Sequence, residues 1–243
     1  MKLEFKLKEL KTDDKGVRLQ FMNVRCAFVY IATPDTRYAT EDKGGNVDKA
    51  SYQLTMLIPK SPEFQKKFGS LMQQAAQLTN VKELSDQDRQ KCLEIALSLD
   101  EGSVLKDGNN SLSKDNGQIY DGFAEHYSIR AHTQAIKTAR GFEPRMPLEL
   151  VNLKNQPIPR DQHATEFYSG MWADVIVTFK PFKNGTNKGI TGYLGAVRKV
   201  ADDAPFGGSV TFEDTRDDID IETKEPEAVR AVDGVKTPGF LDE

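Results

Sequence analysis

Aromatic and basic side chains alternate along the predicted strand 171–181, and they are the residues best suited to chemistry in this chain. Trp172 and Lys180 fall on the face opposite the apolar residues of that strand, and Phe182 continues the pattern. Aromatic rings stack on nucleic-acid bases of any sequence, and basic groups pair with phosphates. This face therefore predicts a surface that binds a single-stranded nucleic acid without reading its sequence.

Neighbouring segments add residues of the same two types. Tyr193 and Lys199 belong to the predicted strand 189–200, and Arg130 lies on the polar face of the predicted strand 122–133. The remaining candidates lie beyond these strands, in loops and at a predicted hairpin tip: Lys137, Arg140, Phe142, Arg145 and Lys183. We predict that the aromatic members stack on bases and that the basic members contact phosphates.

Structural roles offer an alternative for several of these residues. Trp172 is also explained by packing under a loop or in a dimer interface, and Phe182 and Tyr193 by ordinary packing in a barrel. Arginine and lysine on strand exteriors also keep exposed sheet edges soluble. The interleaving of aromatic and basic residues on several segments favours binding over these separate explanations.

The sequence lacks the motifs of common catalytic and metal sites. It contains no CxxC, HExxH, GxxxxGK[ST] or GxSxG pattern. His126 and His132 share one strand face but lie about 20 Å apart at the rise of a strand, too far to share a metal. The acidic run Asp217–Asp220 offers the alternative of a metal-dependent nuclease, although the patterning around it predicts disorder. We therefore expect no catalysis, no metal and no cofactor.

Hydrophobic patterning predicts a mainly β chain with a helical insertion. Strands are predicted at residues 19–32, 50–58, 122–133, 171–181 and 189–200. Apolar residues at helical spacing predict two helices within about residues 61–100, with Ser61 and Ser85 as N-caps. Short antiparallel strands with a helical insertion favour a small closed barrel of OB-fold type over a parallel α/β sheet.

Charge divides the chain into a mildly basic body and an acidic C-terminal segment. Residues 213–243, called the acidic tail below, carry about −7, whereas the whole chain carries −4. We predict that residues 1–212 form the OB-fold domain and that the acidic tail is disordered and flexible. Such a tail can occupy a basic groove when nucleic acid is absent.

The remaining compositional features favour a cytoplasmic protein. No run of about eighteen apolar residues occurs, so we expect no membrane span. The N-terminus lacks the apolar stretch of a signal peptide. The two cysteines, Cys26 and Cys92, both lie in apolar segments, which favours reduced thiols in the core.

The stretch Phe167–Val175, FYSGMWADV, resembles a strand entry found in a group of bacteriophage single-stranded DNA-binding proteins. Further short motifs follow in the order of that family: Lys106–Gly108, Pro147, Pro157–Ile158, Lys180–Phe182, Lys188–Ile190, Leu194–Val197 and Phe206–Gly208. The resemblance covers roughly residues 18–210, and the order and spacing of the motifs carry it more than any single one.

The resemblance implies an OB-fold that coats single-stranded DNA in phage replication and recombination, within the host cytoplasm. It also implies a function similar to that of the single-stranded DNA-binding protein of T7-like phages, whose acidic C-terminus contacts replication partners and competes with DNA. Phe240 departs from the usual pattern, because three residues follow it, whereas such tails often end in an aromatic residue. The alternative is a non-catalytic protein-interaction or virion-associated β-barrel module, and a homodimer is a reasonable expectation.

Overall fold

Nine β-strands form the framework of the part of the chain that the computed structural model describes, which is residues 3–37, 50–79, 84–100, 102–114 and 116–207. The strands are β1 (Lys6–Asp13), β2 (Gly16–Asp35), β3 (Ser51–Pro59), β4 (Leu105–Asp107), β5 (His126–Thr138), β6 (Gly141–Pro144), β7 (Glu149–Val151), β8 (Trp172–Asn184) and β9 (Asn187–Ala201). The α-helices are α1 (Pro62–Ala76), α2 (Asp86–Leu97) and α3 (His163–Glu166). The prediction of a mainly β chain with a helical insertion is confirmed.

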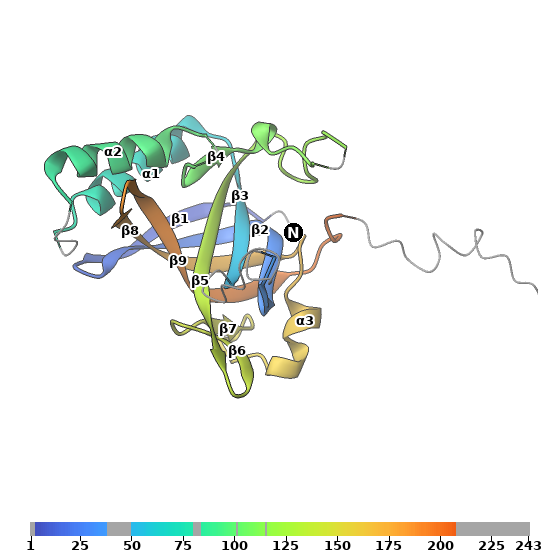
Figure 1. The fold of residues 1–243 in the computed structure, drawn as a ribbon. Coiled ribbons are helices and arrows are strands. Elements are labelled where there is room, and N and C mark those ends of the chain that lie inside the picture. The colour runs from blue at the N-terminus through green and yellow to red at the C-terminus, as the bar shows by residue number, and fades with distance from the viewer. Residues whose placement is uncertain (1–2, 38–49, 80–83, 101, 115, 208–243) are drawn as a thin grey trace, which may run out of the picture. The chain divides into compact units, whose positions relative to one another are not determined.

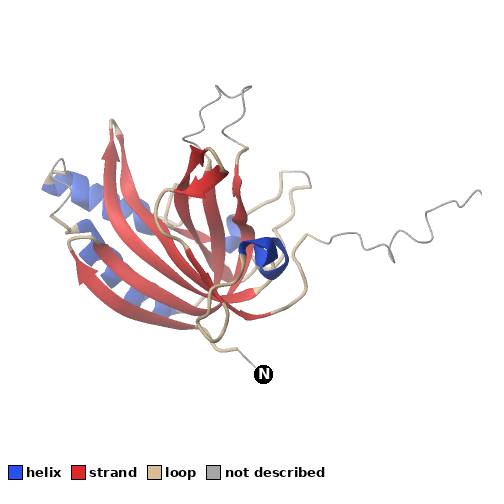
Figure 2. Ribbon diagram, turned by 90° about the horizontal axis from the view of Figure 1, so that it is seen from below, coloured by secondary structure: helices blue, strands red, loops and turns tan. Residues whose placement is uncertain are grey.

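Five of the strands close into a ring. β2 pairs antiparallel with β3 and β8, β3 pairs with β5, and β8 pairs with β9. A short parallel pairing of β5 and β9, at His132 and Tyr193, completes the circuit. β2 reaches both neighbours because its first half pairs with β8 and its second half with β3. This closed order fits the predicted OB-fold type, and Figure 2 shows how strongly the strands curve.

The inward side chains of the ring and one face of α1 form the main core. Phe21 of β2, Phe68 of α1 and Phe179 of β8 are fully buried. Their ring centroids lie 5.6–6.4 Å apart, in tilted or edge-to-face contacts. Burying each such side chain contributes roughly 2 kcal/mol to folding. The helices α1 and α2 lie together on one side of the ring, whereas α3 lies away from them, at the lower right of Figure 1.

Both helices of the insertion begin at the predicted N-caps. The Ser61 hydroxyl accepts a hydrogen bond from the backbone N–H of Phe64 at 3.1 Å. The Ser85 hydroxyl accepts one from the backbone N–H of Asp88 at 3.2 Å, and the Asp88 carboxylate accepts one from the N–H of Ser85. These bonds satisfy backbone donors that the first helical turn leaves without partners.

Four strands were not predicted, and each has a local reason. β1 is exposed along nearly its whole length and has only two apolar residues, Leu7 and Leu10; it forms by pairing with the first part of β2. β4, β6 and β7 have three or four residues each. They are too short to show a pattern, and they pair with β5 or β9.

Several predictions fall on residues that the structure does not describe. The acidic tail lies outside the described residues, so its flexibility and the boundary at residue 212 stay predictions.

Cys26 and Cys92 are both buried and form no disulfide, as predicted. Within the described ranges, no helix is long and apolar enough to cross a membrane.

Candidate nucleic-acid interface

A groove of about 390 Å³ crosses the outer surface of the ring, where β8 and β9 pass beside the turn between β1 and β2. We call it the β8–β9 groove. Its lining includes Lys15, Arg18, Met146, Ile176, Lys180 and Tyr193. The groove therefore combines three basic side chains, one aromatic ring, apolar walls and one carboxylate, that of Glu149.

Strand register places one row of side chains across this surface. Arg18 of β2 lies opposite Thr178 of β8, and Thr178 lies opposite Tyr193 of β9. Tyr193 pairs in turn with His132 of β5. The residues on either side of Thr178 are fully buried in the core. Because side chains alternate along a strand, the members of the row point outward.

Tyr193 has a charged neighbour on one side and a neutral ring on the other. The Lys180 ammonium lies 5.9 Å from the centroid of the Tyr193 ring. The His132 ring lies 6.1 Å from the Tyr193 ring, at an interplanar angle of 37°. Burial, and next the charge of Arg130, lower the pKa of His132 to about 4, so its imidazole is neutral at pH 7. Base stacking and phosphate contact need this combination of ring and fixed charge.

The structure brings two of the predicted site residues into the groove and two more to the neighbouring outer face of β5. Lys180 and Tyr193 line the groove itself. Arg130 is exposed on β5, two residues before His132 and on the same strand face. Arg145 joins them from the segment after β6, because its guanidinium donates to the side chain of Gln134 at 2.6 Å.

Trp172 lies at the opposite end of β8 from this group. Eight residues separate it from Lys180, about 25 Å along a strand. Its indole N–H donates to the Asp203 carboxylate at 2.8 Å, and the ring is half-buried. This position fits packing against the segment that follows β9, which was one of the two interpretations of Trp172.

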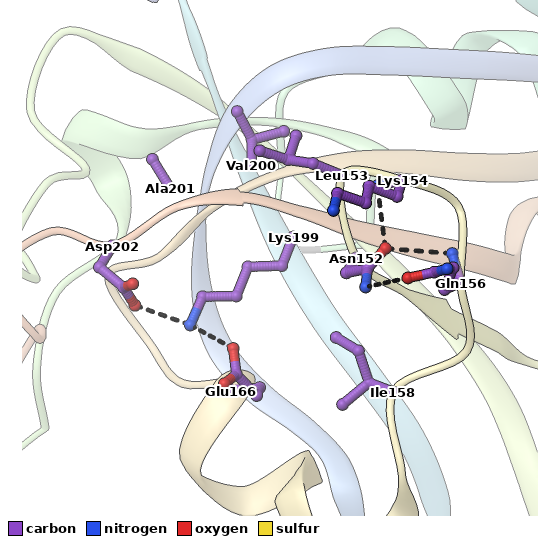
Figure 3. A pocket seen from close by; sticks show the side chains of 10 residues that line it. All are labelled: Asn152, Leu153, Lys154, Gln156, Ile158, Glu166, Lys199, Val200, Ala201 and Asp202. Carbon is purple, nitrogen blue, oxygen red and sulfur yellow. Dashed lines mark hydrogen bonds and ion pairs between the residues drawn. The ribbon is translucent and has the colours of Figure 1, made fainter.

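Lys199 lies away from the groove, where it forms ion pairs with two carboxylates. Its ammonium lies 2.7 Å from Glu166 and 2.7 Å from Asp202, and 13% of its side chain is exposed. Figure 3 shows it between these carboxylates, in a separate pocket of about 380 Å³ beside the loop that contains Asn152. A phosphate would have to displace both ion pairs to reach it.

Phe182 and Lys183 lie near the tip of the β8–β9 hairpin, beside α2. The Phe182 ring covers Gly189, where an added Cβ would come within 3.1 Å of the ring. The Lys183 ammonium lies 2.8 Å from the Asp88 carboxylate of α2, and Lys188 pairs with the same carboxylate. These contacts tie the hairpin to the helix.

Three further predicted residues belong to the hairpin that β5 and β6 form. Lys137 lies opposite Phe142 in the pairing, and Arg140 lies at the turn. Lys137 and Arg140 are exposed, whereas Phe142 packs against the small cluster around Tyr52. The DNA-binding roles predicted for all eleven site residues, those of the groove included, stay predictions.

The comparisons agree with the architecture described above. The family model described as "Enterobacter phage Enc34, ssDNA-binding protein" matches residues 17–228. The chain belongs to this family. The solved structure of the bacteriophage Enc34 single-stranded DNA-binding protein in complex with ssDNA is similar, with a TM-score of 0.54 and 21% identity, over 83% of this chain and 99% of that chain. Its C-terminally truncated form gives a TM-score of 0.54 and 21% identity over 83% of this chain and 98% of that one. No curated protein sequence matches the chain.

In this member of the Enc34 family, the residue-pattern reasoning missed two basic residues of the groove. Lys15 and Arg18 flank the turn at Gly16, whose φ of +138° favours glycine. An added Cβ at Gly16 would come 2.5 Å from Thr178, so the turn lies directly against β8. The predicted strand 19–32 begins one residue after Arg18. Extending its alternation of buried and exposed side chains by one residue would have placed the Arg18 side chain outward.

The described part of this Enc34-family chain contains no group of three or more His, Cys, Asp and Glu side chains that could hold a metal ion. The run Asp217–Asp220, on which the nuclease alternative rests, lies outside the described residues. The groove has cations and an aromatic ring, and these features suit binding.

Proposed function

We propose that this chain binds single-stranded DNA without reading its sequence, and that it acts without catalysis in phage DNA replication and recombination. Membership in the Enc34 family and the similarity to a protein that has been solved with ssDNA support this proposal. The single observation that carries it is the row across the β8–β9 groove, in which Arg18, Thr178 and Tyr193 align beside Lys180.

In this proposal, a base stacks on Tyr193 while its flanking phosphates meet Lys180, Arg18 and Lys15. Stacking of a base on an aromatic side chain contributes about 1–3 kcal/mol and tolerates every base. The Lys180 ammonium lies 5.9 Å from the centroid of the Tyr193 ring, so a phosphate next to a base on that ring comes within its reach. Affinity then falls as salt rises, because phosphate contacts release counterions.

We further propose that the acidic tail competes with DNA for the basic surface and recruits replication or recombination proteins. Its charge of about −7, next to a body of opposite sign, supports this role. A homodimer, in which the tail of one copy serves the other, is part of the same proposal.

The test is titration of the full chain with fluorescently labelled oligo-dT and with duplex DNA at two salt concentrations. We expect binding to the single strand, with Tyr193→Ala weakening it about tenfold and Tyr193→Phe retaining it. Replacing Lys180 or Arg18 by Gln should reduce the slope of log affinity against log salt by roughly 0.7 for each phosphate that the protein no longer neutralises.

The controls separate the proposal from its alternative. Lys154→Gln removes an exposed lysine outside the groove and should leave affinity unchanged. If the full chain and a form lacking the acidic tail both fail to bind oligo-dT at low salt, the proposal is wrong. The protein-interaction module is then the better account.

A further inference from the structure

Residues 202–207 continue from the end of β9 without forming a strand or a helix, and we call them the strap. Only Phe206 is half-buried, and the other five residues of the strap are exposed. The strap therefore has little apolar burial of its own. Contacts with segments that are distant in the sequence must hold it in place.

Arg25 of β2 holds the middle of the strap. Its guanidinium donates to the Ala204 carbonyl at 2.8 Å, lies 3.5 Å from the Asp203 carboxylate and lies 4.3 Å from the centroid of the Phe206 ring. It also donates to the Gly170 carbonyl at 3.0 Å, which fixes its orientation. A planar guanidinium can make these contacts together, because its edge donates hydrogen bonds while its face stacks on a ring.

The segment just before β8 is the surface on which the strap lies. The backbone N–H of Phe206 donates to the Ser169 carbonyl at 2.9 Å. Gly170 has a φ of +110°, and an added Cβ there would clash with the carbonyl oxygen of Ala204. The stretch FYSGMWADV and the motif that begins at Phe206 are thus in contact, although more than thirty residues separate them.

The far end of the strap is held by the turn at Gly122. The Phe206 ring covers this glycine, whose φ is +78°, so closely that an added Cβ would clash with the ring. The backbone N–H of Gly207 donates to the Asp121 carboxylate at 3.1 Å. Both ends of the strap are therefore fixed, one by β9 and the other by this turn.

The strap ends beside basic groups of the outer surface. Tyr120, which precedes the turn, lines a hollow of about 510 Å³ together with Arg130 of β5. Glu213, the first residue of the acidic tail, follows Gly207 by six residues. Six residues span at most about 20 Å. A fixed strap therefore keeps the start of the acidic tail within a short reach of this surface.

We propose that the strap is a latch that fixes the point at which the acidic tail leaves the ring of strands, and that Arg25 and Phe206 keep the latch closed. The proposal rests on the proposed competition between the acidic tail and DNA, and it names the residues that regulate this competition. Detaching the strap moves the last fixed residue back from Gly207 to Ala201. The tether to Glu213 then grows from six residues to twelve.

A longer tether should weaken the competition. The effective concentration of a tethered group falls roughly as the −3/2 power of the tether length, so doubling the length lowers it about threefold. A chain with a detached strap should therefore bind single-stranded DNA more tightly than the unmodified chain, although the acidic tail is still present.

Trp172 reports whether the strap is in place. It is the only tryptophan of the chain, and its indole N–H donates to the Asp203 carboxylate at 2.8 Å. Detachment removes this bond and lets water reach the indole, which shifts tryptophan emission to longer wavelength. The state of the strap can thus be measured separately from DNA binding.

The experiment compares the full chain with its Phe206→Ala variant, which loses the ring without a change of charge. We expect up to threefold tighter binding of labelled oligo-dT at low salt, a red shift of Trp172 emission and faster hydrogen exchange at residues 203–207. Ile136→Ala is the matched control, because Ile136 is an exposed apolar residue of the β5–β6 hairpin, away from the strap. It should change none of the three measurements.

A second background separates the latch from a direct effect on DNA binding. It is the full chain with the acidic residues of the tail changed to Asn and Gln. There, Phe206→Ala should still shift Trp172 emission but should leave DNA affinity unchanged, because the tail no longer competes. Arg25→Gln should shift the emission in the same way, and its own lost charge is accounted for in this background.

The outcomes distinguish the latch from the competition on which it rests. If the neutral tail tightens binding but Phe206→Ala does not, although Trp172 emission shows detachment, the latch is refuted and the competition stands. Equal tightening by Phe206→Ala with the acidic and the neutral tail would also refute the latch. Unchanged emission in the chain that carries both Arg25→Gln and Phe206→Ala would show that these residues do not hold the strap. If the chain binds oligo-dT but the neutral tail changes nothing, the competition fails and the latch fails with it.

Discussion

Tyr193 is the residue at which three strands contribute to one chemical environment. β9 supplies the ring, β8 supplies the Lys180 ammonium, and β5 supplies the His132 ring. His132 is neutral in this setting, because burial makes its charged form unfavourable. The positive charge beside Tyr193 therefore comes from lysine and arginine, and His132 does not contribute to it.

The lowered pKa of His132 predicts how stability depends on pH. The folded chain holds a pKa of about 4, below the value of about 6.5 for an unfolded histidine, so the unfolded chain binds more protons between these values. The contribution of the neutral, buried His132 to the free energy of unfolding is therefore fully present above about pH 6.5. It is lost as pH falls toward 4. The loss is on the order of 3 kcal/mol.

Urea unfolding at several pH values checks this prediction. Comparing the unmodified chain with His132→Gln isolates the histidine, because all other titrating groups are shared. The variant should lose less stability between pH 7 and pH 4.5. Equal losses in both proteins would contradict the assignment.

The β8–β9 hairpin is the element that joins the groove to the helical insertion. Its strands form the groove near the middle of the hairpin, and near its tip Lys183 and Lys188 pair with Asp88 of α2. Hydrogen bonds from these lysines, Lys183 first, hold the pKa of the Asp88 carboxyl well below its usual range. Their stabilisation is therefore present above about pH 4 and is lost as pH falls further.

Removing the Asp88 charge should loosen the hairpin tip. Asp88→Asn weakens both ion pairs and the capping box of α2, so we expect a lower thermal midpoint and faster hydrogen exchange at residues 183–188. Asp86→Asn removes a charge from the same helical turn and serves as the control. Identical exchange in the two variants would show that Asp88 does not anchor the hairpin.

At the scale of the whole molecule, several contacts hold the last described residues against the ring of strands. Arg25 lies 4.3 Å from the centroid of the Phe206 ring, and the backbone N–H of Gly207 donates to the Asp121 carboxylate at 3.1 Å. Phe206 also packs in the same small cluster as Phe28 and Tyr120. The last described residues, up to Gly207, are thus anchored beside the Phe28 and Tyr120 rings.

Deletion of residues 213–243 tests the proposed competition between the acidic tail and DNA. The deletion removes about −7 of charge, so we expect severalfold tighter binding of oligo-dT at low salt. The gain should shrink as salt rises, because ions screen the attraction between tail and body. A tail of equal length with its acidic residues changed to Asn and Gln should behave like the deletion. No gain from either change would refute the competition.

The sequence by itself determined the elements with strong periodicity and local capping. The alternation in β3, β8 and β9 and the serine caps at Ser61 and Ser85 are local features, because each depends on residues a few positions apart. The order of strands and helices excluded a parallel α/β sheet, and the order of short motifs indicated the family.

Tertiary structure decided which of the candidate side chains meet. Lys180 and Lys199 both lie on strand faces of similar pattern, yet Lys180 lines the groove and Lys199 pairs with Glu166 and Asp202. The partners of Lys199 come from α3 and from the residues after β9. The side-chain pattern around Lys199 in the sequence therefore does not predict them. Likewise, Arg18 and Tyr193 align in one row only through the pairing of β2, β8 and β9, which brings together positions more than a hundred residues apart. Side-chain periodicity depends on residues that are close in the sequence, whereas a binding surface depends on register between distant strands.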